Sequence, residues 1–119
     1  MTDPQLRDYL RENGYPEHVV RGGRKGLIER WKKFADEVEQ GYRFGLEDYR
    51  NDLDLRGVIA LIGQDEEVRD ADERLHAMLT ATDQRVWESF GGDPFWDFGY
   101  PRNATGELLR DLRTAGIAD

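Results

Sequence analysis

The residues best suited to chemistry lie in a short basic segment rich in glycine. Arg21, Arg24 and Lys25 surround Gly22-Gly23 immediately before a strong helical pattern. Backbone N–H groups and cationic side chains at the start of a helix bind phosphates and carboxylates. The G-x-x-x-x-G-K-[ST] spacing of a nucleotide-binding loop is absent. Because cations at this end of a helix oppose its macrodipole, we expect an acidic neighbour there: an internal ion-pair cluster, an anionic ligand or a partner protein.

Other reactive residues do not form a complete catalytic or metal-binding set. His18 and His76 are far apart in the sequence, and neither has a second ligand three or four positions later. Asp52 and Asp54 could be the first and third residues of a twelve-residue calcium-binding loop. The fifth residue of that loop would be Arg56 and the twelfth would be Gly63. A calcium ion there would lack the bidentate carboxylate that it requires. We therefore predict a protein that is not an enzyme and that uses no metal or cofactor.

Aromatic side chains gather in two segments bounded by glycine or proline. Residues 95–100 hold four rings between Pro94 and Pro101, and residues 41–45 hold two more. Proline removes a backbone donor and restricts the preceding residue, so the first segment cannot be a continuous helix. The rings either close one end of a helical bundle or form a contact surface, where Trp, Tyr and Arg are typical anchors. The candidate partner-binding residues are Tyr42, Phe44, Asn51, Asp52, Trp96, Phe98, Tyr100 and Arg102.

Asn51 and Asp52 belong to this set because they fall near the middle of a predicted helix over 46–62. Their short polar side chains compete for nearby backbone hydrogen bonds and are weak helix formers. One interpretation is that they bond across to residues 41–45 and fix the path of that turn. The other is that they form a polar face that recognises a partner.

Apolar residues recur at helical spacing along most of the chain, and no segment shows the alternation of a strand. The clearest helix covers about 24–40, where Leu27, Trp31, Phe34 and Val38 share one face. Start and stop signals predict further helices at about 46–62, 65–79 and 83–90, and one that begins after Asn103 or Thr105. They also predict a first helix with Asp3 as its N-cap and Pro4 as its first residue, which ends at Asn13-Gly14.

The sequence thus predicts one all-α domain over residues 1–119, a compact bundle of five to six short helices with the aromatic segment before the last. Residues 15–24 are a connector, broken by Gly22-Gly23, with at most one short helical turn. The predicted core is Trp31, Phe34, Val38, Leu53, Ile59, Leu75, Met78, Leu79, Trp87 and Leu109.

Composition limits the classes of partner. The chain has 119 residues, a net charge of −8 and no cysteine, which excludes disulfide scaffolds and thiol catalysis. No apolar run is long enough to cross a membrane and the first residues do not resemble a signal peptide, so we expect a cytoplasmic protein without membrane contact. A net negative charge disfavours nucleic acid and favours a protein partner with a basic surface.

These observations favour a non-catalytic, acidic protein-binding module, a small cytoplasmic regulator, inhibitor or adaptor of another protein. The alternative is a small-ligand or anion-binding domain that uses the segment from Arg21 to Lys25.

Overall fold

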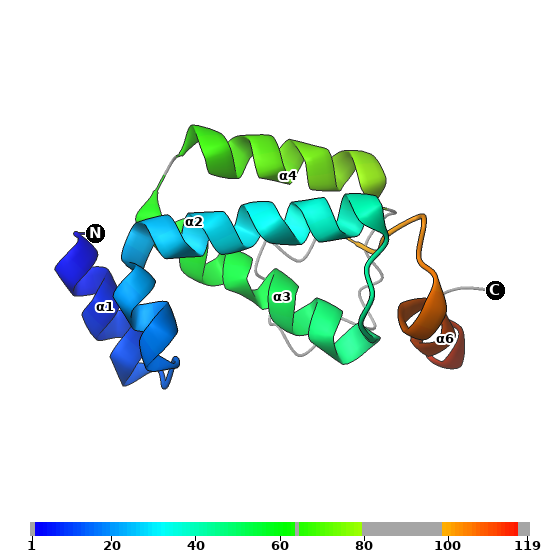
Figure 1. The fold of residues 1–119 in the computed structure, drawn as a ribbon, viewed down its shortest axis with the longest axis horizontal. Coiled ribbons are helices and arrows are strands. Elements are labelled where there is room, and N and C mark those ends of the chain that lie inside the picture. Colours follow the sequence, from blue (N-terminus) through cyan, green and yellow to red (C-terminus); the bar gives the residue numbers. More distant parts are fainter. Residues whose placement is uncertain (1, 64, 80–98, 117–119) are drawn as a thin grey trace.

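The computed structural model describes residues 2–63, 65–79 and 99–116, and these residues form an all-α bundle (Figure 1). The helices are α1 (Asp3–Glu12), α2 (Glu17–Gln40), α3 (Leu46–Ile59), α4 (Glu66–Met78) and α6 (Gly106–Thr114), and the 3-10 helix η1 (Ala60–Ile62) continues α3. The predicted helix over 83–90, with Trp87, lies outside the described residues. None of the described helices is long and apolar enough to cross a membrane.

Helix α2 is the centre of the bundle, because it packs against α1, α3 and α4. In Figure 1, α4 runs along one side of α2 and α3 lies on the other. Helix α6 packs against α3. The predicted apolar stripes meet at these contacts, and the buried side chains include Trp31, Phe34, Val38, Leu53, Ile59, Leu75 and Leu79.

Two of the predicted core residues are less buried than we expected. Met78 and Leu109 are both half-buried, and Met78 packs against the core. In α6 the buried residues are Leu108 and Leu112. These two leucines are four positions apart and therefore share the face that packs inward, whereas Leu109 lies at the edge of that face.

The start of α1 differs from the prediction that Asp3 is its N-cap. Thr2 holds that position, since its side chain accepts from Gln5 N while the Gln5 side chain accepts from Thr2 N. This capping box satisfies the first turn of α1. The Asp3 carboxylate is then available to accept a hydrogen bond from Arg24 N, at 3.1 Å.

A kink at Gly23 divides α2 into two helical segments. Gly23 has φ 58° and ψ −148°, a conformation that is essentially restricted to glycine. The predicted break is therefore confirmed, although residues 17–22 form more helix than the connector that we expected. Because the second segment begins at the kink, Asp3 caps its first turn from α1.

Helix α6 fixes the start of α3. The Asp111 carboxylate accepts a hydrogen bond from Leu46 N, at 3.0 Å. A Cβ atom at Gly45 would lie 2.6 Å from the same carboxylate oxygen, so the absence of a side chain lets Asp111 approach. The turn between α2 and α3 is thus held in place by a residue of α6.

Candidate functional site

The turn between α2 and α3, residues 41–45, directs its two aromatic rings in opposite ways. Tyr42 is buried, with 1% of its surface exposed, whereas Phe44 is 51% exposed. The rings meet edge to face, with centroids 5.8 Å apart and an interplanar angle of 76°. Tyr42 also packs against Phe34 and Tyr49 in the core. Phe44 is therefore an exposed ring on a firmly anchored turn.

Asp52 fixes the buried ring of this turn from α3. The Tyr42 hydroxyl donates a hydrogen bond of 2.5 Å to an Asp52 carboxylate oxygen. Burial raises the pKa of Tyr42 well above its ordinary value, and the Asp52 carboxylate raises it further, so the phenol stays protonated and donates. The contact agrees with the interpretation that Asp52 bonds across to residues 41–45. Asn51 is exposed, and its role in a recognition face stays a prediction.

Asp52 is also a source of pH-dependent stability. Burial raises its pKa, and the neighbouring Asp48 raises it further, against the opposing effects of Tyr42 and Arg30. A carboxyl group whose pKa is higher in the folded protein contributes stability at low pH that is lost as the pH rises through the folded-state pKa. Asp52→Asn keeps an acceptor for Tyr42 but cannot titrate.

We therefore expect the stability of Asp52→Asn relative to the wild type to increase as the pH is raised from about 4, the ordinary pKa of aspartate, to 7. Urea unfolding at a series of pH values measures this difference. A difference that is constant with pH, or that decreases, would contradict the assignment.

Two hollows flank Phe44. One, of about 230 Å³, is lined by Arg30, Lys33, Phe34, Glu37, Phe44, Asp52 and Leu55. The other, of about 290 Å³, is lined by Lys33, Glu37, Gln40, Gly41, Arg43 and Phe44. We call Phe44 and these two hollows the Phe44 surface. Apart from Asp52, its charged residues were not among the predicted contact residues, although Arg30, Lys33 and Glu37 are spaced three and four apart on α2, which places them on one helical face.

The basic segment from Arg21 to Lys25 meets acidic residues of its own chain. Asp3 accepts from Arg24 N, and the Arg24 guanidinium lies 3.5 Å from the Asp65 carboxylate. A carboxylate at this helix start offsets the conflict with the macrodipole. The contacts thus support the internal ion-pair cluster among the three alternatives. Arg21 and Lys25 are both exposed.

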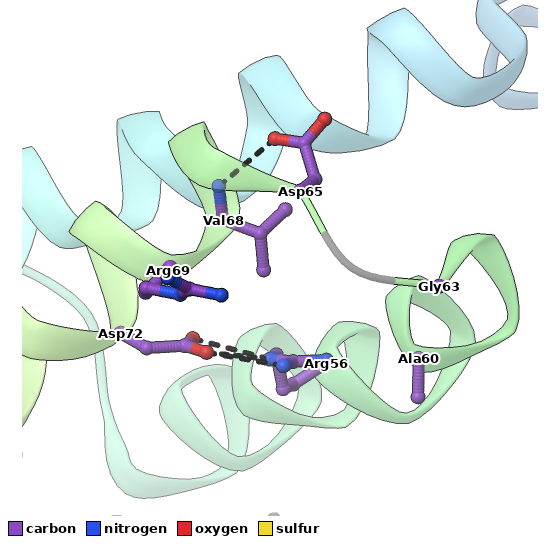
Figure 2. A pocket seen from close by; sticks show the side chains of 7 residues that line it. All are labelled: Arg56, Ala60, Gly63, Asp65, Val68, Arg69 and Asp72. Carbon is purple, nitrogen blue, oxygen red and sulfur yellow. Dashed lines mark hydrogen bonds and ion pairs between the residues drawn. The ribbon is translucent and has the colours of Figure 1, made fainter.

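A further hollow, of about 410 Å³, lies between α3 with η1 and α4 (Figure 2). Its lining includes Arg56, Asp65, Arg69 and Asp72. Arg56 donates from Nε and Nη2 to Asp72, whose Oδ1 also accepts from Trp31 Nε1 at 2.9 Å. Asp65 caps α4 by accepting from Val68 N and Glu67 N. Asp72 thus joins α4 to α2 and α3, and Asp65 joins the start of α4 to Arg24 of α2. Because both carboxylates are used in contacts between helices, we interpret this hollow as structural.

Of the predicted contact residues near position 100, the structure describes Tyr100 and Arg102, and neither lines the hollows beside Phe44. Tyr100 is 3% exposed and packs against Tyr49, whose hydroxyl donates to Gly99 O. Its ring is therefore part of the core, and we remove it from the candidate surface. Arg102 is exposed and its backbone N–H bonds to Met78 O. Trp96 and Phe98 lie outside the described residues.

Known proteins add nothing to this description. Family models, curated proteins and solved structures were compared with the chain, and none matches.

His18 and His76 are exposed. Within residues 2–63, 65–79 and 99–116, no group of three or more acidic or histidine side chains is arranged to hold a metal ion.

Proposed function

We propose that the protein is a non-catalytic protein-binding module, a small cytoplasmic regulator, inhibitor or adaptor, with Phe44 as its anchor. The observation that carries the proposal is the exposure of half of this aromatic side chain on an ordered turn. Aromatic side chains that are already held in place lose little conformational freedom when a partner covers them, and Phe, like Tyr and Trp, is enriched at the cores of protein interfaces.

The rigidity of the turn supports binding through this surface. Tyr42 is anchored by Asp52, and Leu46 N is capped by Asp111. Asn103 Nδ2 also donates to Val38 O, close to the end of α2. These contacts come from α3, from α6 and from the segment before α6, so the position of Phe44 is set by the whole bundle.

The polar groups near Phe44 support binding over catalysis. The Tyr42 hydroxyl and the Asp52 carboxylate are engaged with each other. A catalytic acid or base needs to reach a substrate atom within hydrogen-bond distance. With this pair already bonded, a ligand can contact the ring of Phe44 and the charged side chains that line the two hollows.

Substitution of Phe44 by Ala is expected to weaken binding of the partner protein at least about tenfold. The tagged full-length protein would be used to capture partners from the lysate of the native host, and dissociation constants would be measured with the purified partner. Leu61→Ala is the matched control, because Leu61 is the other exposed large apolar residue of the described chain and lines neither hollow.

Circular dichroism melts would establish that both variants are folded. A partner that binds Phe44→Ala and the wild type equally would place the contact surface elsewhere. Capture of no protein by the wild type would contradict the binding-module proposal itself.

A further inference from the structure

The side chains that line the two hollows include more cations than carboxylates, whereas the chain as a whole is acidic. The chain has a net charge of −8. The two hollows, in contrast, are lined by three cations, Arg30, Lys33 and Arg43, and by two carboxylates, Glu37 and Asp52. Since local charges determine which groups fit against a surface, the expectation of a basic partner from net charge does not apply at Phe44.

The three cations are available to a partner. Lys33 and Arg43 are exposed, as is Arg30. Among the described residues, none of the three forms a hydrogen bond or ion pair, in contrast to Arg24, Arg56 and Arg74. Arg30 does interact electrostatically with Asp52, where it opposes the rise in pKa that burial causes, so Lys33 and Arg43 are the more available pair. The Asp52 carboxylate is engaged by Tyr42 and half-buried. Glu37 is then the acidic group of the two hollows that an incoming ligand meets. Asp48, which is exposed and raises the pKa of Asp52, lines neither hollow.

We propose, on the basis of the function proposed above, that the Phe44 surface binds an acidic segment of the partner protein that also carries a large apolar side chain. The apolar side chain would pack against Phe44 in one of the two hollows, where it loses contact with water. Acidic side chains on either side of it would pair with Arg30, Lys33 and Arg43, which lie around the ring.

A nucleic acid would also present negative charge and flat bases to an aromatic ring, but the surface fits it less well. Glu37 lines both hollows, so a phosphate backbone that crosses the ring would meet a carboxylate. The remainder of the chain is acidic and would repel a long polyanion. A peptide can place its few acidic groups next to the cations and avoid Glu37.

The test uses the full-length protein and a displayed library of random peptides. Selected peptides would be synthesised with a fluorescent label, and their affinities would be measured by anisotropy. The variants are Phe44→Ala, the pair Lys33→Gln with Arg43→Gln, and the pair Arg21→Gln with Lys25→Gln. The last pair removes the same charge from exposed positions outside the Phe44 surface. The charge variants retain the ring, so they test the surface even if Phe44→Ala fails to fold.

We expect the selected peptides to combine acidic residues with an aromatic or aliphatic residue. Their affinity should fall at least about tenfold for Phe44→Ala and for the double variant Lys33→Gln with Arg43→Gln. It should be nearly unchanged for the double variant Arg21→Gln with Lys25→Gln.

Other results would separate the two proposals. One such result is a set of peptides that bind through Phe44 but are basic, or that keep their affinity when Lys33 and Arg43 are replaced by Gln. Such peptides would contradict the proposal of an acidic partner segment, while the proposal of a protein-binding module would stand. Selection of no peptide that depends on Phe44 would overturn the proposed function at this surface. Tighter binding of a labelled single-stranded oligonucleotide, lost in the Lys33 and Arg43 pair, would replace the peptide by a nucleic acid.

Discussion

Replacement of Asp72 by Ala is expected to lower the free energy of unfolding by about 2–4 kcal/mol, because it removes an acceptor that two largely buried donors share. Asp72 accepts hydrogen bonds from Trp31 of α2 and from Arg56 of α3. The Arg56 side chain is 15% exposed and that of Asp72 is 20% exposed. Loss of the carboxylate would leave a largely buried guanidinium and an indole N–H without this acceptor.

Asp70→Ala is the matched control for this prediction. Asp70 lies on the same helix, two positions earlier, and is exposed. Both substitutions replace an aspartate inside α4 by the best helix former, so the difference between them isolates the contacts of Asp72. Urea unfolding followed by circular dichroism measures both. If the two variants unfold at the same urea concentration, the network does not hold the three helices together.

The second large effect is expected at the kink of α2. Gly23→Ala should destabilise the protein by about 2–4 kcal/mol, from backbone strain and from crowding of the Asp3 cap. The conformation of Gly23 has a positive φ of 58°. A Cβ atom there would also lie 3.2 Å from the Asp3 oxygen that caps the second segment of α2.

Gly26→Ala, three residues later, should have the opposite sign. Gly26 is helical and a Cβ atom there has nothing within 4 Å, so alanine adds no clash. It reduces the conformational freedom of the unfolded chain and should stabilise the protein by about 0.4–1 kcal/mol. Thermal or urea unfolding of the two variants distinguishes these signs. Stabilisation by Gly23→Ala would show that the kink is not required for the packing of α1 on α2.

The helices were predictable from the sequence because their signals are local. Leu27, Trp31, Phe34 and Val38 already repeat at helical spacing, and the structure buries all four. The N-cap of a helix is harder to predict, because two adjacent residues can both be suitable for that position. Thr2 and Asp3 are both good N-caps, and Thr2 is selected since Gln5 completes a capping box while Asp3 reaches Arg24.

The candidate site was only partly predictable, because its parts are distant in the sequence. The glycines of residues 41–45 indicated a turn with two aromatic rings, but nothing local distinguishes the ring that is buried. Tyr42 faces inward because its hydroxyl finds Asp52 there, whereas Phe44 has no polar atom to satisfy. Likewise, the acidic neighbours of Arg24 come from α1 and from the N-cap of α4.

The bond from Leu46 to Asp111 has a consequence for synthesis on the ribosome. The donor and the acceptor are 65 positions apart in the chain. Helices α2 and α3 emerge long before α6, so a nascent chain lacks the acceptor that caps the first turn of α3. Contacts between distant residues form only after loop closure, and they order late. The turn that carries Phe44 therefore reaches its final setting only after α6 has emerged from the ribosome.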